Sequence, residues 1–241
     1  MASPDGGNRR ARTSRRAARK ATRRGASAAP KEGRRKQPGK TAAVFLDRDG
    51  TLIEEVGYVN HPDRARLFPW AARAVRKLNR AGLTVVVVTN QSGVARGYFS
   101  EALVRRVHRD IAREFRKAGA RVAAFYYCPH HPASRIRKYR RDCRCRKPET
   151  GMIEAAAKKF GINVSDSYVV GDSYRDMQTG FNAGARTVMV LTGYGLGEYT
   201  YLRRTWPRRP DNVVRDLRDA VEIILKNRRA GRRRPAALPS K

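Results

Sequence analysis

Polar side chains follow several short apolar runs of this sequence, each at the point where the run ends. A lone Asp-x-Asp pair usually marks a polar turn, but here three runs end in polar groups of this kind. Because the carboxyl ends of parallel strands meet at one edge of a sheet, we expect these side chains to converge on one site. The residues at the ends of the runs are Asp47, Asp49, Thr89 and Asp172; Lys147, in a polar loop before a helix, and Asp176, four residues after Asp172, complete the set.

This set of groups suits the transfer of a phosphoryl group. A phosphate dianion repels an anionic nucleophile, so Asp47 can attack phosphorus only where cations neutralise the local charge. Oxygen atoms of Asp47 and Asp172, with a backbone carbonyl near Asp49, suit the coordination that Mg²⁺ prefers. Lys147 and the Thr89 hydroxyl can stabilise the transferred group, and the Asp49 side chain can carry protons.

Asp176 fits three roles on the sequence alone. It can support the metal from outside its ligand shell, orient Lys147, or place negative charge at a helix N-terminus.

All three cysteines fall in one short segment, in the patterns Cys128-x-His130 and Cys143-x-Cys145. Four ligands of these types suit a closed tetrahedral zinc site, so we predict structural zinc, with buried free thiols as the alternative. The matched spacing favours His130 as the ligand, although the adjacent His131 stays an alternative. The pattern also favours a reducing compartment over a disulfide framework.

Short β-rich runs alternate with helical patterns through the middle of the chain. Strands are expected over 42–46, 83–88, 122–127, 167–170 and 187–191, and helices over 70–81, 100–118, 151–160, 175–183 and 214–226. The alternation predicts an α/β fold with a doubly wound, mainly parallel sheet and helices on both faces. The intervals between the polar motifs leave no room for an added cap domain.

The formal charge of +33 is concentrated toward the ends of the 241-residue chain. Residues 1–40 and 227–241 are rich in Arg and Ala, so we expect two disordered basic tails around one domain at 41–226. Such tails attract nucleic acid weakly and without sequence preference, and a nucleic-acid-associated protein is the alternative of another class. No apolar run reaches the roughly 18 residues that span a bilayer, so we expect no membrane partner. We also expect a cytoplasmic location, and a monomer as the default oligomeric state.

The motifs described above, beginning with Asp47-x-Asp49-Gly-Thr, occur in the order that resembles the haloacid dehalogenase superfamily of phosphotransferases. The resemblance implies a Mg²⁺-dependent phosphatase in which Asp47 is the nucleophile and Asp49 the acid and base. It also implies that Asp47, Asp49 and Asp172 form the magnesium site, while Thr89 and Lys147 stabilise the phosphoryl group.

Residues 41–225 are similar to the heptose-bisphosphate phosphatase family of this superfamily, through the zinc loop and the segments 44–51, 57–59, 89–97, 127–132 and 143–148. The resemblance implies a small phosphorylated sugar as substrate, recognised by Arg146. The other substrate-contacting residues would be Glu55, Val56, Gly57, Tyr58, Asn90, Gln91 and Ser92.

One position departs from that family. Ser173 follows Asp172 where relatives often carry a basic residue that meets the substrate. Histidinol phosphatases are the alternative, since they share the zinc loop but usually differ over 91–97. Polynucleotide 3′-phosphatases also have capless domains, but without the zinc loop.

Overall fold

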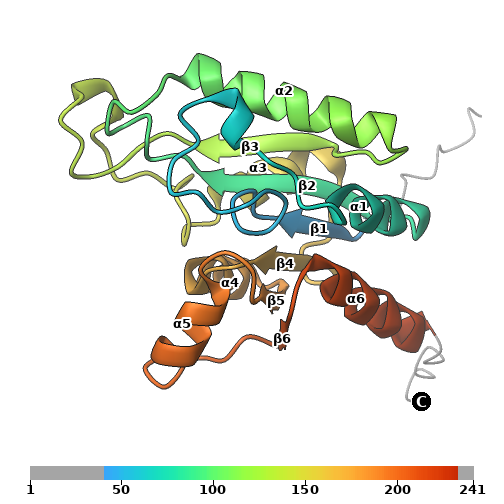
Figure 1. Ribbon diagram of the computed structural model, residues 1–241. Helices are drawn as coiled ribbons and strands as arrows, with labels where there is room; N and C mark the ends of the chain where they lie inside the picture. The colour runs from blue at the N-terminus through green and yellow to red at the C-terminus, as the bar shows by residue number, and fades with distance from the viewer. Residues whose placement is uncertain (1–40, 233–241) are drawn as a thin grey trace, which may run out of the picture. The chain divides into compact units, whose positions relative to one another are not determined.

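The computed structural model describes residues 41–232. The tail expected at 1–40, and the part of the other tail from 233 to 241, lie outside the described residues. Within them, parallel strands form one sheet in the order β3-β2-β1-β4-β5-β6 (Figure 1). The strands are β1 (Ala43–Leu46), β2 (Thr84–Asn90), β3 (Ala124–Cys128), β4 (Tyr168–Gly171), β5 (Arg186–Val190) and β6 (Asn212–Val214).

Helices connect these strands. They are α1 (Ala71–Arg80), α2 (Glu101–Lys117), α3 (Gly151–Phe160), α4 (Tyr174–Ala183), α5 (Gly195–Leu202) and α6 (Leu217–Arg232), with two 3₁₀ turns, η1 (Pro62–Arg64) and η2 (Arg137–Tyr139). The Ser100 hydroxyl accepts a hydrogen bond from the Leu103 backbone N–H, which caps α2 at its first turn.

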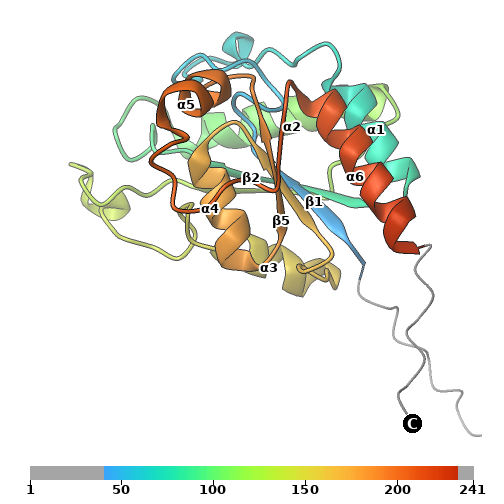
Figure 2. The ribbon, with the colours of Figure 1, turned by 90° about the horizontal axis from the view of Figure 1, so that it is seen from below.

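Both faces of the sheet are buried. Val44 and Leu46 of β1 face a core shared with α1, α2 and α6, whereas Ala43 and Phe45 face a second core shared with α3. Figure 2 shows α3 and α4 on one side of the sheet and α1 and α6 on the other. The predicted doubly wound parallel sheet is therefore confirmed, and burial on both faces explains the unbroken apolar run in β2.

The structure adds strand β6 and helix α5 and shifts several boundaries, most of all those of α6. Strand β6 has three residues, too few to show a period, and α5 contains two glycines in its eight residues, which weakens its helical pattern. Helix α6 begins after the expected start and continues to Arg232, so residues 227–232 are helical and not part of a tail. Arg and Ala are strong helix formers, so a basic composition did not end this helix.

The described residues contain no separate cap domain, as predicted, because η1 and η2 are the only regular elements between β1 and α1 and between β3 and α3. None of the described helices is long and apolar enough to cross a bilayer. The connections run one way from β1 to β3 and the other way from β4 to β6. The carboxyl ends of β1 and β4 therefore form the switch point at which open α/β sheets bind ligands.

Candidate functional site

The switch point brings together four of the predicted polar residues. Asp47 follows β1, and its backbone N–H donates to the Val170 carbonyl of β4 (2.9 Å). Asp172 follows β4 directly, and Asp176 lies in the first turn of α4. The Nζ atom of Lys147 lies 2.8 Å from Asp47 Oδ1 and 2.5 Å from Asp176 Oδ1. Segments far apart in the sequence thus place one ammonium group among three carboxylates.

Asp176 uses both carboxylate oxygens within the protein. Its Oδ1 pairs with Lys147, and its Oδ2 accepts from the backbone N–H of Ser173 (3.1 Å) and from the Ser173 hydroxyl (2.7 Å). Two of the three roles open from the sequence therefore apply, the orientation of the lysine and negative charge at the N-terminus of α4. Ser173 is the N-cap of that helix, so the departure from the family pattern has a structural role here.

Asp172 lies in a tight backbone cradle. Its Oδ2 accepts a hydrogen bond from the Tyr194 backbone N–H (2.8 Å). A Cβ atom added at Gly50 or at Gly193 would lie 2.0 Å from this oxygen, and both glycines have positive φ. The Thr192 hydroxyl donates to the Gly50 carbonyl (2.5 Å). The loop after β5, which no sequence motif indicated, therefore closes around Asp172.

The burial of these groups shifts their proton affinities. Burial raises the pKa of Asp47 to about 7; the Lys147 ammonium opposes this, and the charges of Asp176 and Asp49 add to it. Burial also raises the pKa of Asp172, and the charge of Asp47 adds to that effect. Burial disfavours the charge on Lys147, but Asp176 and Asp47 together raise its pKa above the ordinary value. The site therefore holds its lysine charged.

The carboxylates suit a hard divalent cation. One oxygen each of Asp47, Asp172 and Asp176 lie within 4.8 Å of one another. Both oxygens of Asp176 are engaged, by Lys147 and Ser173, whereas Asp47 and Asp172 each contact a donor through one oxygen, so Asp47 and Asp172 are the donors that a metal would use. Asp47 Oδ1 is buried, and its polar contact is the Lys147 ammonium at 2.8 Å. Carboxylate oxygens of this kind fit Mg²⁺.

The Asp49 side chain lies outside that group and is held by its own hydrogen bonds. Arg48 donates from Nη2 to Asp49 Oδ1 (2.9 Å) and from Nε to Oδ2 (3.1 Å). Gln91 Nε2 donates to the same Oδ2 (2.9 Å), and the Thr89 hydroxyl lies 3.4 Å from it. Arg48 is 1% exposed, and the sequence interpretation gave it no role. Its place between two aspartates was the available signal.

A cavity of about 420 Å³ opens onto these side chains. The predicted substrate contacts that line it are Glu55, Gly57, Tyr58, Asn90, Gln91 and Ser92. The other two lie outside the lining: Val56 packs against the core, and Arg146 donates from Nη1 to the His130 carbonyl (3.1 Å). Residues that the sequence interpretation did not select complete the lining, among them Arg175, Tyr194 and Glu198.

Arg175 brings a positive charge to the lining of this cavity, and Arg146 and Arg96 lie outside the lining. Burial lowers the pKa of Arg146, and the neighbouring charges of Arg175 and Arg96 lower it further. Such mutual repulsion requires the guanidinium groups to lie near one another. Since Arg175 reaches the lining, this side of the cavity suits an anionic group of a ligand.

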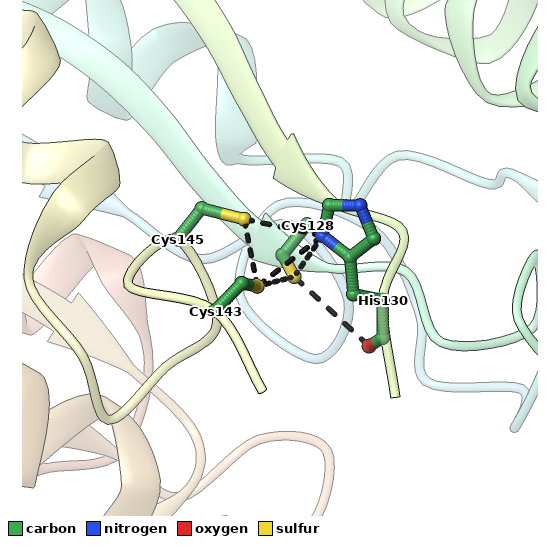
Figure 3. A group of neighbouring side chains, drawn as sticks. All are labelled: Cys128, His130, Cys143 and Cys145. Carbon is green, nitrogen blue, oxygen red and sulfur yellow. Dashed lines mark hydrogen bonds between the residues drawn. The ribbon is translucent and has the colours of Figure 1, made fainter. Parts of the chain in front are cut away.

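Figure 3 shows the predicted zinc ligands turned toward one another: Cys128, His130, Cys143 and Cys145. Five of the six separations between their ligand atoms run from 3.1 Å, between the Sγ atoms of Cys143 and Cys145, to 3.7 Å, between Cys128 Sγ and His130 Nδ1, and all four atoms lie within 4.8 Å of one another. Tetrahedral zinc with ordinary bond lengths needs separations of about 3.5–3.8 Å, so two of these distances match a bound ion and the three shorter ones would lengthen around it; the donor types fit this metal. His131 points elsewhere, since its Nδ1 accepts from the Ala133 N–H (3.2 Å).

Comparisons with known proteins agree with this geometry. Residues 144–220 match the Hydrolase_like family model, described as HAD-hydrolase-like. The D-glycero-β-D-manno-heptose-1,7-bisphosphate 7-phosphatase of Escherichia coli (strain K12) is 36% identical over 188 residues, which are 78% of this chain and 95% of that protein. The protein of the same name from Rhodopseudomonas palustris is 44% identical over 142 residues, 59% of this chain and 79% of that one.

Solved structures similar to this chain also include heptose 1,7-bisphosphate phosphatases. The D,D-heptose 1,7-bisphosphate phosphatase from B. bronchiseptica, solved with magnesium and phosphate, is similar with a TM-score of 0.69 and 32% identity. That match covers 78% of this chain and 99% of the other. The enzyme of the same type from Burkholderia thailandensis matches with a TM-score of 0.55, also at 32% identity, over 77% of this chain and 99% of that one.

Proposed function

The chain belongs to the D-glycero-β-D-manno-heptose-1,7-bisphosphate 7-phosphatase family, and from this premise we propose that it is a Mg²⁺-dependent phosphatase that removes the 7-phosphate of that sugar. One observation carries the proposal beyond the family match. The carboxylate of Asp47 lies at the sheet's switch point, beside the Lys147 ammonium and within reach of Asp172. A nucleophile, a charge partner and a metal ligand thus share one cavity wall.

In the proposed reaction, a carboxylate oxygen of Asp47 attacks phosphorus as the bond from phosphorus to the sugar oxygen breaks. Asp49 gives its proton to that leaving oxygen. Asp49 then takes a proton from a water molecule whose oxygen attacks the aspartyl-phosphate, which releases inorganic phosphate and restores Asp47. Lys147 and the Thr89 hydroxyl stabilise the negative charge of the phosphoryl group during both transfers.

Two metals complete the proposal. Asp47, Asp172 and the backbone carbonyl of Asp49 would hold Mg²⁺, which when bound neutralises phosphate charge at the nucleophile. The cluster of three cysteines and His130 would hold structural Zn²⁺. Arg146 and Lys147 follow the last cysteine directly, so an ordered zinc loop positions both of them.

A bisphosphate suits the charge distribution of the cavity. The reacting phosphate would lie at Lys147, and we assign the second phosphate to the side where Arg175 lines the cavity near Arg146. Because Ser173 caps α4 and carries no charge, Arg175, two residues further on, brings the positive charge that α4 contributes there. Arg146 would act in substrate recognition from beside the zinc cluster.

The direct test compares phosphate release from heptose 1,7-bisphosphate, histidinol phosphate and a 3′-phosphorylated oligonucleotide, with Mg²⁺ present. We expect the highest kcat/KM for the bisphosphate, and no turnover by Asp47→Asn, which should still show a cooperative thermal unfolding transition. The matched control is Asp63→Asn on exposed η1, which should keep full activity. Activity in Asp47→Asn, or preference for the oligonucleotide, would refute the proposal.

A further inference from the structure

His108 is buried although it belongs to the basic helix α2. Its residue exposure is 6%. The ring stacks on Phe125 with centroids 4.8 Å apart and meets Tyr127 edge-on at 5.7 Å. Its Nε2 atom lies 3.3 Å from Nη1 of Arg48, the buried arginine that pairs with Asp49. The proposed reaction assigns this histidine no step.

The pairing determines the protonation state of the histidine. A guanidinium group has N–H donors and no acceptor, so Nε2 must accept the hydrogen bond from Arg48. The imidazole is therefore neutral and carries its proton on Nδ1. Burial and the positive charge of Arg48 lower the pKa of His108 to about 3, which agrees with a neutral ring at physiological pH.

Three acceptors hold the Arg48 guanidinium from different parts of the fold. Asp49 accepts from Nε and Nη2, Gln91 Oε1 accepts from Nη2 (2.9 Å), and His108 Nε2 accepts from Nη1. Gln91 in turn donates from Nε2 to Asp49 (2.9 Å) and to the Thr89 hydroxyl (2.9 Å). Asp49 and Gln91 line the cavity, whereas His108 anchors the network from α2, behind it.

We propose that His108 is a positioning residue for proton transfer: it fixes Arg48, which holds the Asp49 carboxylate in its reactive orientation. The inference rests on the proposed function, because it assumes that Asp49 gives a proton to the leaving sugar oxygen. Without the acceptor on α2, the guanidinium has a free N–H in the protein interior and shifts toward other oxygens. Asp49 then loses its fixed placement, and proton donation suffers more than phosphoryl transfer itself.

Comparing substrates with different leaving groups separates an effect on proton donation by Asp49 from an effect on phosphoryl transfer. A sugar alcohol leaves only when protonated, whereas the p-nitrophenolate of p-nitrophenyl phosphate leaves without a proton. The kcat/KM value reports the steps through departure of the leaving group, so its ratio for the two esters measures how well Asp49 donates. The matched variants are His108→Met and His108→Gln, which have similar side-chain size and differ in the hydrogen-bond acceptor.

We expect His108→Met to lose roughly ten- to a hundred-fold in kcat/KM for heptose 1,7-bisphosphate and under about two-fold for p-nitrophenyl phosphate. His108→Gln should recover most of the first value. Phe125→Leu, which changes the stacking but keeps the acceptor, should lower the thermal unfolding temperature without changing the ratio. If His108→Met fails to fold, His108→Phe keeps the ring shape and makes the same comparison with His108→Gln.

Equal losses for both esters, or a glutamine variant no better than the methionine variant, would overturn the positioning role. Those results still leave an active wild-type phosphatase. A wild type that hydrolyses neither ester refutes the proposed function, and the inference with it, so the two failures are distinguishable.

Discussion

Replacing Lys147 by methionine tests the central ion pair of the site. Its side chain is 4% exposed, and Nζ contacts Asp47 Oδ1, Asp176 Oδ1 and the Val88 carbonyl within 3.1 Å. Removing one partner of a buried ion pair costs about 3–5 kcal/mol because it leaves uncompensated charge. For a domain of this size each kcal/mol corresponds to about 2–4 °C, so Tm should fall by about 6–20 °C in metal-free buffer.

The same change should strengthen the response to magnesium. The ammonium lies 2.8 Å from the proposed nucleophile and competes with any cation for its charge. Without it, Mg²⁺ neutralises Asp47 and Asp172 alone, so the rise in Tm on adding Mg²⁺ should exceed that of the wild type. Turnover should still be lost, since no ammonium remains to stabilise the phosphoryl group.

Thermal unfolding with and without Mg²⁺ measures both effects. The control is Lys117→Met, which removes an exposed pair with Glu114 (2.9 Å, lysine side chain 65% exposed). Exposed pairs contribute about 0–1 kcal/mol, so the control should lose less than about 4 °C and keep its activity. A Lys147→Met protein as stable as this control, or with no larger response to Mg²⁺ than the wild type, contradicts the reasoning.

Three further predictions concern the metals, the pH dependence and the second phosphate. The wild type should contain about one zinc per chain by metal analysis, and a folded, zinc-free wild type would contradict the zinc assignment. Cys143→Ser should lose this zinc, with a clear fall in Tm and only a small change in kcat. The folded-state pKa of Asp47 (about 7) exceeds its ordinary value of 3.8, so the metal-free folded protein binds more protons between these values and loses stability as pH rises through them. Mg²⁺ displaces those protons, so its stabilising effect in thermal unfolding should be larger near pH 8 than near pH 5, and equal effects would refute the assignment. Arg175→Ala should raise KM for heptose 1,7-bisphosphate by roughly ten-fold, and change KM for a monophosphate ester little; equal changes in steady-state assays would place the second phosphate elsewhere.

The doubly wound sheet was predictable because its signals are local. Consecutive apolar residues mark strands covered on both faces, and polar residues at their ends indicate the edge where ligands bind. Elements without such a signal were missed, as β6 and α5 illustrate. The end of α6 was misplaced because Arg-rich composition is shared by helices and by disordered segments.

The residues of the candidate site also fall into two groups, those that the sequence identified and those whose roles depend on tertiary contacts. Asp47, Lys147 and Asp172 were identifiable from residue type and from their order along the chain. By contrast, the roles of Arg48 and His108 depend on a contact across 60 residues, in which α2 brings an imidazole behind β1. No local pattern encodes such a contact, because it depends on how a helix packs against the sheet.

The sequence alone determined the class of fold, the set of chemical groups and the three cysteines of the candidate zinc site, because spacing and residue type carry that information. The tertiary structure decided how those groups are used. It directed His130 and not His131 toward the cysteines, engaged Asp176 with Lys147 and the cap of α4, and placed Arg175 at the cavity. These outcomes depend on side-chain direction and burial, which are set when distant segments pack together and the charges they bring must find partners.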